Sequence, residues 1–201
     1  MVIHSGLALS GMSSLMNYMQ IAATENTIYT SPDASKIFCY TPSIIVTPTG
    51  RLIVSFDLGG EGVKSIEGHK SSRAGGSRFG QGKIFISDDN GQQKWTFVQN
   101  FPFWHARLFT IGNSIYLIGH AGDICIMKSE DNGESWSDTY FLTHGEKWHS
   151  SACNVLFSNG NVYLAMEQRC RLNEVTGWDV AGLSPTLFRA CVEDNLCLAS
   201  S

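Results

Sequence analysis

Histidine and glutamate side chains stand at the ends of apolar, strand-like runs in this 201-residue chain. His105 follows Trp104 where one run begins, and His149 follows Trp148 ahead of another. Glu167 closes an apolar run, where a lone carboxylate is costly unless it is paired or faces an open channel. Because histidine titrates near neutral pH, either histidine suits the removal of a proton. The two histidines and the glutamate are therefore candidate catalytic groups.

Other residues near these runs are candidates for binding a substrate. Tyr40, Trp104 and Trp148 would suit stacking on sugar rings if they face a channel. Arg107 could supply a positive charge, and Asp57 ends a strand-like run where it could share the role of the glutamate. Each histidine and aromatic residue also has a structural interpretation, in which it caps a strand or packs in the core. The residue types alone leave both interpretations open.

A metal site has only weak support in the sequence. His120 and His144 also fall at strand or turn ends. With His149 and Cys153 they could form a cluster of metal ligands, although their position in loops alone explains them. The six cysteines include no C-x-x-C pair, and a chain of this length does not need a disulfide framework. We interpret most of the cysteines as buried thiols and expect no metal or cofactor.

The elements that must position these residues are β-hairpins. Three segments, at residues 43–56, 106–118 and 154–165, share one pattern: an apolar run, a short turn with glycine, and a β-branched or aromatic run. This pattern is typical of a β-hairpin. No segment has a helical period strong enough to predict a helix. Residues 58–82, rich in glycine and serine, are expected to form a loop excursion between two strands.

Two acidic turns bend the strand pairs between these hairpins. One fits the pattern S-x-D-x-G-x-x-W at every fixed position, and the other has one extra residue before its tryptophan. Serine and aspartate can hydrogen-bond the turn backbone, glycine takes a positive φ, and tryptophan packs on neighbouring strands. We therefore interpret the aspartates as structural rather than catalytic. The fixed residues are Ser129, Asp131, Gly133 and Trp136 in the first turn and Ser87, Asp89 and Gly91 in the second.

The spacing of the acidic turns predicts a β-propeller. Their opening serines are separated by about one period of a four-stranded blade, ~40–45 residues. Propellers close with ~4–8 blades, and this chain has room for roughly four. It stops just after a new strand begins. We therefore predict an all-β fold in a single propeller domain over residues 1–201, incomplete and truncated at its C-terminus.

The composition argues against several classes of partner. Hydrophobic residues make up 43% of the chain and charged residues 16%, which is typical of a globular protein. The net charge is −4 and the basic residues are scattered, so no basic stripe is present to bind nucleic acid. No apolar run approaches the roughly 18 residues of a membrane span, and residues 1–23 lack the basic start of a signal peptide. We expect no nucleic-acid or membrane partner, and the compartment stays open.

The two acidic turns at blade spacing resemble the Asp box of sialidases and their relatives. The resemblance covers most of the chain, from about residue 27 to the end. Residues 39–57 look like the opening blade of these propellers. Residues 104–109 and 148–167 resemble the central segments of a bacterial group that includes sialidases and ulvan-type polysaccharide lyases. The resemblance implies a sialidase-like propeller fold and a carbohydrate substrate or ligand.

The sequence departs from the sialidase pattern at a residue that matters for activity. Sialidases hold the substrate carboxylate with three arginines, and the first lies in an Arg-Ile-Pro motif of the opening blade. Tyr40-Thr41-Pro42 occupies that place in this chain. A phenol does not replace the bidentate hydrogen bonds of a guanidinium group. Sialidase activity proper is therefore disfavoured.

Only some of the lyase site residues have a match in this sequence. By this resemblance His105 matches the first histidine of the family, and His149 matches the histidine that follows a tyrosine. Trp148 stands in the place of that tyrosine, and Leu164 stands where the lyases have an arginine. Arg107 is one of three arginines that could replace the lost charge; Arg169 and Arg171 are the others.

Two hypotheses for function follow, together with a third possibility. The first is an enzyme that cleaves an acidic glycan, as a glycosidase or as a polysaccharide lyase. Its site would contain His105, His149, Glu167 and Tyr40, with Arg107 as a possible member. The second is a non-catalytic glycan-binding module, which the missing arginine and tyrosine would suit. The third is that the truncated chain has no stable function of its own.

Overall fold

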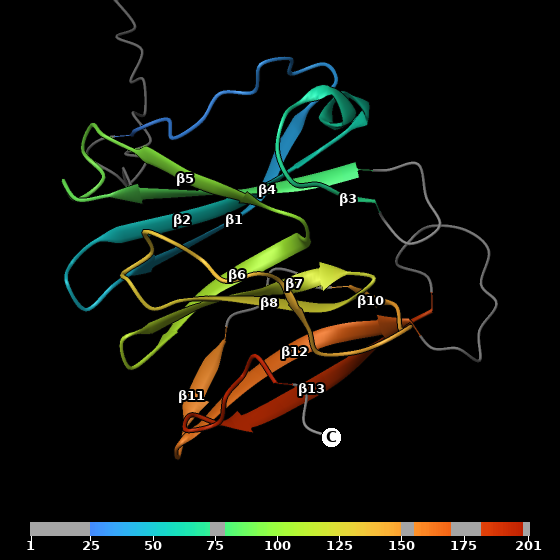
Figure 1. Cartoon of the computed structure of the whole chain (residues 1–201). Coiled ribbons are helices and arrows are strands. Elements are labelled where there is room, and N and C mark those ends of the chain that lie inside the picture. The colour runs from blue at the N-terminus through green and yellow to red at the C-terminus, as the bar shows by residue number, and fades with distance from the viewer. Residues whose placement is uncertain (1–24, 73–78, 150–154, 170–181, 199–201) are drawn as a thin grey trace, which may run out of the picture.

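The structure is a computed structural model that describes residues 25–72, 79–149, 155–169 and 182–198. Strands dominate the described residues, and a single short 3-10 helix, η1 (Glu61–Ser65), is found there. No helix in this part of the chain is long and apolar enough to cross a membrane. The strands form three antiparallel sheets (Figure 1).

The first sheet contains the N-terminal strands. Its path runs from β1 (Phe38–Val46) through β2 (Leu52–Gly59) to β4 (Phe79–Ser87). Both β5 (Thr96–Phe101) and the short β3 (Ser71–Ser72) pair with β4. The predicted loop over residues 58–82 thus holds the end of β2, η1, β3 and the start of β4, while residues 73–78 lie outside the described ranges.

The second sheet is a meander of four consecutive strands. Its order is β6 (Trp104–Ile111), β7 (Ser114–Ala121), β8 (Asp123–Ser129) and β9 (Tyr140–Phe141). The turn between β6 and β7 contains Gly112 at φ 58, as the hairpin pattern predicts.

The third sheet is built around one long strand, β12 (Asn161–Arg169). The short strands β10 (Trp148–His149) and β11 (Leu156–Ser158) pair with different parts of β12. The strand β13 (Leu183–Cys191) pairs with β12 along its whole length.

The three sheets lie one after another, with the β6–β9 sheet between the other two (Figure 1). The strand β6 contacts β1 and β2 of the first sheet, and β10 contacts β7. Neighbouring sheets therefore approach one another through their early strands, as in the blades of a propeller. The predicted all-β class and propeller type are confirmed.

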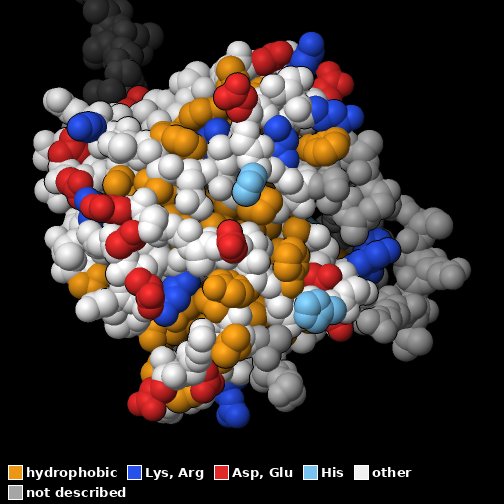
Figure 2. Space-filling view, in the orientation of Figure 1, with side chains coloured by type: hydrophobic (Ala, Val, Ile, Leu, Met, Phe, Trp, Pro, Cys, Tyr) orange, Lys and Arg blue, Asp and Glu red, His pale blue; other side chains and the backbone are white. Residues whose placement is uncertain are grey.

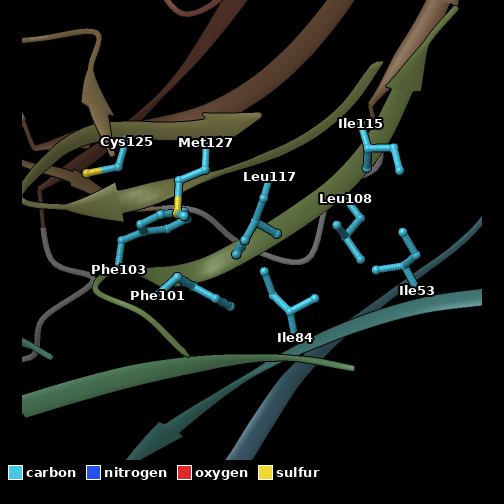
Figure 3. Packing of buried hydrophobic residues seen from close by; sticks show 10 residues of the cluster. Ile53, Ile84, Phe101, Phe103, Leu108, Ile115, Leu117, Cys125 and Met127 are labelled. Atoms are coloured by element: carbon cyan, nitrogen blue, oxygen red, sulfur yellow. The ribbon is translucent and has the colours of Figure 1, made fainter. Parts of the chain in front are cut away.

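Apolar side chains fill the spaces between neighbouring sheets. The largest cluster joins the first and second sheets and includes Ile53, Ile84, Phe101, Phe103 and Leu117 (Figure 3). Phe101 and Phe103 pack with ring centroids 4.7 Å apart. Because these side chains are fully or almost fully buried, the hydrophobic effect holds the two sheets at a fixed spacing.

The second and third sheets pack through two further clusters. One contains Phe109, Tyr116, Ile126, Val162 and Cys197, and the other contains Ile124, Trp148, Leu164 and Met166. Exposed apolar side chains also occur on the surface, among them Ile44 of β1, Leu156 of β11 and Leu187 of β13. Figure 2 shows acidic and basic side chains interspersed on the face that it presents, with apolar side chains between them.

The acidic turns have the hydrogen bonds that their sequence pattern predicts. The amide of Gly133 donates to Oγ of Ser129 at 2.9 Å, and Asp131 accepts from Ser129 and from the amide of Ser135. Gly133 has φ 86, and the preceding Asn132 is also left-handed, at φ 61. These aspartates serve the turn backbone, which supports the structural interpretation.

Arg51 joins the acidic turns of neighbouring sheets. Its guanidinium group donates to both carboxylate oxygens of Asp88, at 2.6 and 3.0 Å. It also donates to the carbonyl of Asn132 at 3.1 Å and to Glu134 at 3.3 Å. The arginine side chain is only 12% exposed. The carboxylates themselves are exposed, at 66% for Asp88 and 65% for Glu134, so the bidentate geometry and the several partners of one arginine, rather than burial, strengthen this link.

We predict that Gly133→Ala destabilises the fold more than Gly112→Ala. Both glycines have positive φ, which costs an alanine about 1 kcal/mol. A Cβ at position 133 would lie 2.4 Å from Cδ1 of Ile53, whereas a Cβ at position 112 meets nothing within 4 Å. Overpacking adds about 1–3 kcal/mol at position 133 alone. Urea unfolding followed by tryptophan fluorescence measures both losses, and equal losses would contradict the close packing of this turn on the first sheet.

Candidate active site

Six polar side chains come together from strand ends of all three sheets. Tyr40 of β1 and Asp57 of β2 are register partners, as are His149 of β10 and Glu167 of β12. In the second sheet β6 begins, and β7 ends, at the same edge. The group consists of Tyr40, Asp57, His105, His120, His149 and Glu167.

Three histidine rings form the centre of this arrangement. His105, His120 and His149, called the histidine group below, come from β6, β7 and β10. The ring centroid of His105 lies 4.7 Å from that of His149 and 5.2 Å from that of His120. The ring centroids of His120 and His149 are 5.6 Å apart. Nε2 of His120 is 3.3 Å from Nδ1 of His105, so the two rings share a hydrogen bond.

Glu167 is paired with a member of the histidine group. Its Oε2 lies 3.3 Å from Nδ1 of His149, and both side chains are partly exposed, at 23% and 20%. The sequence predicted that this carboxylate would be paired or would face an open channel, and the structure shows the pair. A carboxylate in this position holds the imidazole in one orientation.

Two aromatic residues border the histidine group on the side of the first sheet. The ring of Tyr40 lies 6.1 Å from that of His105 and stacks on Trp104 at 6.2 Å. Trp104 packs over Gly80, where an added Cβ would lie 2.3 Å from the indole. Both aromatic side chains are half-buried. Tyr40 therefore lies within reach of the group, with Trp104 supporting it.

The histidine group depends on two irregular strands. The register of β1 shifts between Tyr40 and Ser43, and the register of β6 shifts between Trp104 and Arg107. Thr41 and His105 lie within these bulges and both have φ 52. Left-handed backbone is strained for residues other than glycine, and bulges of this kind redirect side chains near functional sites.

Asp57 connects the two bulges from a fully buried position. Its Oδ2 accepts a hydrogen bond from Oγ1 of Thr41 at 2.6 Å and another from the amide of His105. Only 1% of Asp57 is exposed, and Oδ1 has no hydrogen-bond partner in the described part of the chain. Burial raises the pKa of this carboxyl to about 7, although the hydrogen bonds and the positive charge of Arg107 oppose the rise.

Arg107 is buried rather than directed to a ligand. It is 7% exposed, and its Nη1 donates to the carbonyl oxygens of Ala106, at 2.9 Å, and Thr41, at 3.5 Å. These contacts hold the backbone of both bulges. The guanidinium group thus has a structural role, which is to bind backbone carbonyls within the site.

Trp148 is not brought to the histidine group. Its side chain is buried in an apolar cluster with Leu164 and packs at a tilt against Phe188, with ring centroids 5.0 Å apart. Its indole N–H donates to Glu146 at 2.7 Å. This tryptophan therefore contributes to packing between the second and third sheets.

The structure gives little support to the metal site that the sequence left open. Within the described ranges, no group of three or more metal-ligating side chains is arranged to hold an ion. His144 is exposed on a loop, and Cys153 lies outside the described residues. Cys125 and Cys197 are buried free thiols, as expected, whereas Cys39 is exposed and Cys191 is partly so.

Sequence reasoning gave too little weight to His120 and Asp57. Both stand at the ends of apolar strands, as Glu167 does, and that signal was present. What the sequence does not reveal is the register that sets His120 opposite Trp104, or the burial of Asp57 between two sheets. Both properties depend on packing between strands that are far apart in the chain.

No protein-family model and no curated protein matches this chain. Among solved structures, an α-L-arabinanase from Penicillium chrysogenum in complex with arabinobiose is 14% identical, with a TM-score of 0.50. The match covers 76% of this chain and 46% of the arabinanase. An ulvan lyase is 18% identical over 64% of this chain and 32% of its own, with a TM-score of 0.46.

A sialidase, NanB from Streptococcus pneumoniae, is also similar. It is 9% identical over 66% of this chain and 36% of its own, with a TM-score of 0.43. The chain thus spans less than half the length of each of these three proteins. At these identities the likeness concerns the fold alone, and the arabinanase match agrees with the propeller fold.

We predict that Asp57 makes the fold less stable as the pH rises from about 4 to about 7. The folded protein keeps a proton on Asp57 in this window, where the unfolded chain, with a pKa near 3.8, has lost it. The free energy of unfolding therefore falls, by an amount on the order of 2–4 kcal/mol. Asp57→Asn removes the titration, so urea unfolding at several pH values should show the wild type losing stability relative to the variant.

Asp89→Asn provides a control in which the change of stability with pH has the opposite sign. Hydrogen bonds from Ser87 and from the turn backbone lower the pKa of Asp89 to about 2. The stability that Asp89 contributes is present above pH 4 and is lost as the pH falls toward 2. If the wild type and Asp57→Asn keep a constant difference between pH 4 and 7, the burial of an uncharged carboxyl at position 57 is wrong.

Proposed function

We propose that this protein is a carbohydrate-active propeller of the sialidase-like, Asp-box kind that cleaves an acidic glycan by β-elimination. The observation that carries the proposal is the histidine group, which gathers three rings from two neighbouring sheets within 5.6 Å of one another. Tyr40 and Glu167 border it. The arabinanase likeness supports the propeller type on which such a site would be built.

Elimination from a uronate unit needs groups that match this set. A base removes the proton from C5, next to the carboxylate, and the electrons of that bond form a C4=C5 double bond as the C4–O4 bond breaks. An acid gives a proton to the departing O4. A positive group balances the charge that develops on the carboxylate. Imidazole can serve as base or as cation, and a phenol can serve as acid.

The positions of the side chains suggest how these tasks are divided. His105, at the centre of the histidine group and partly exposed, takes the proton from C5. His149, held by Glu167, faces the carboxylate. Tyr40, whose ring is 6.1 Å from that of His105, gives the proton to O4. The proton taken from carbon and the proton given to oxygen pass through different residues, and water restores both.

The carboxyl groups argue against a glycosidase. Most glycosidases use two carboxyl groups that flank the sugar, one of them as an acid and the other as a nucleophile or base. Within the described residues, Asp57 and Glu167 are the carboxyl groups found at this site, and Asp57 is 1% exposed and committed to the two bulges. A buried carboxyl in this position cannot reach a glycosidic bond.

One observation favours a non-catalytic glycan-binding module as the second candidate. Arg107, the residue expected to recognise a carboxylate, is buried and donates to backbone carbonyls. Without that guanidinium group the transition state loses a strong bidentate contact. A binding module requires no such contact.

The first experiment separates these functions. The protein is incubated with uronate polysaccharides and with sialosides, and the ultraviolet absorbance of the unsaturated product is followed beside the release of sialic acid. We expect unsaturated product from the uronate polysaccharides alone. Reducing ends without unsaturation would indicate hydrolysis and contradict elimination. Binding of glycan without any cleavage would favour the second candidate.

We predict that His105→Ala lowers kcat by about 10²–10⁴-fold, because the general base is lost. His144→Ala is the matched control, since His144 is exposed on a loop and lies outside the histidine group. The control should keep the activity of the wild type. Equal activity in both variants would remove His105 from the catalytic site.

A further inference from the structure

We propose that Asp57 is a positioning residue: its carboxyl group holds the bulges of β1 and β6 together and so fixes the place of the His105 ring within the histidine group. The catalytic consequence of this inference rests on the proposed function. The positioning itself does not, because the place of His105 can be measured without a substrate.

The hydrogen bonds of Asp57 reach both strained residues. Thr41 and His105 are left-handed, and Thr41 is β-branched, which makes this conformation especially unfavourable. Such backbone persists only where the surroundings fix it. Asp57 accepts from the side chain of Thr41 and from the amide of His105, so one carboxylate oxygen restrains both bulges.

The burial of Asp57 indicates a role other than stability. A buried carboxyl with an oxygen that lacks a hydrogen-bond partner destabilises a fold, and an apolar residue at that place would not. Residues that break local rules in this way tend to occur at functional sites. The carboxyl lies next to the histidine group, because its hydrogen-bond donor is the amide of His105.

The groups around Asp57 contact other atoms of the two bulges. From β6, Arg107 is the nearby cation, and it donates to the carbonyl oxygens of Thr41 and Ala106. From β1, Tyr40 stands opposite Asp57 in the register, and from β4 the partner is Gly82. A second link between β1 and β6, from the amide of Leu108 to Oγ of Ser43, lies beyond the bulges. Arg107 thus holds the neighbouring carbonyls of the bulges, and Asp57 is the side chain that binds the His105 amide itself.

A displaced bulge would move the central ring. The ring centroid of His105 lies 4.7 Å from that of His149, and its Nδ1 shares a hydrogen bond with Nε2 of His120 at 3.3 Å. Both contacts are short, so a shift of about 1 Å at the His105 backbone changes the relation of this ring to the other two. Misplacement on this scale can lower a catalytic rate by about 100-fold.

The test uses nuclear magnetic resonance of the imidazole groups at about pH 8, above the pKa of Asp57, in the wild type and in Asp57→Asn, whose neutral amide oxygen is a weaker acceptor for both hydrogen bonds than the charged carboxylate. We expect the ring resonances of His105 to shift and the cross-relaxation between the His105 and His149 rings to weaken. The resonances of exposed His144 serve as an internal reference and should stay unchanged. Unchanged His105 resonances and cross-relaxation in Asp57→Asn would overturn the proposal.

Two substitutions at Thr41 test the same link without touching the carboxyl. Thr41→Ser keeps the hydroxyl donor to Asp57, whereas Thr41→Ala removes it. We expect Thr41→Ala to shift the His105 resonances in the same direction as Asp57→Asn, and Thr41→Ser to resemble the wild type. Equal effects of the two would contradict a role for the hydrogen bond. This pair decides the question if Asp57→Asn does not fold.

Kinetic measurements then separate a positioning role from a general disturbance of the fold. Asp57→Asn should lower kcat roughly 10- to 100-fold with little change in KM, because the groups that contact substrate remain. Asp131→Asn is the matched control, since it loosens an acidic turn at the opposite end of β8 from the site. Its histidine resonances and kcat should resemble the wild type. Resonance shifts in Asp57→Asn without any wild-type activity would uphold the positioning and overturn the proposed function.

Discussion

Neighbouring sheets in this protein meet through packed side chains, and this constraint governs everything else in the structure. The backbone ladders hold each sheet together internally. Between the first two sheets, the apolar cluster around Phe101 and Phe103 sets the spacing, and polar side chains set the alignment. Arg51 performs this task at the acidic turns, and Asp57 performs it at the opposite end of the strands. Side chains from different sheets can then meet at one place.

Sequence reasoning predicts best the features that are local. The acidic turns follow from serine, aspartate and glycine at fixed positions, and their hydrogen bonds agree with that interpretation. The glycine hairpins and the all-β class follow in the same way. The candidate residues His105, His149 and Glu167 were found by their place at strand ends, and the structure brings them together.

The remaining features depend on packing between distant segments. Trp148 has the same sequence context as Trp104, yet one packs between sheets while the other supports Tyr40. Arg107 could be predicted as a ligand for a carboxylate, but the bulge of β6 directs it to backbone carbonyls. The bulge at Thr41 has no sequence signal, because a β-branched threonine does not favour left-handed backbone, whereas histidine adopts it more often than most residues do.

The fold and the site support conclusions of different kinds. The propeller type has support from the topology and from the arabinanase likeness, and propellers of one type can host different reactions. The argument for elimination comes instead from the chemistry of the histidine group and from the burial of Asp57, which leaves Glu167 as the accessible carboxyl beside that group in the described part of the chain. Substrate class and reaction therefore depend on the site, and the fold only permits them.

The most direct test is a titration of the protein with a short uronate oligosaccharide, followed through the imidazole resonances of all its histidines. The account predicts that His105, His120 and His149 shift together along one binding curve while His144 stays fixed. If the oligosaccharide binds and these three resonances stay unchanged, the glycan site lies elsewhere and the account is contradicted.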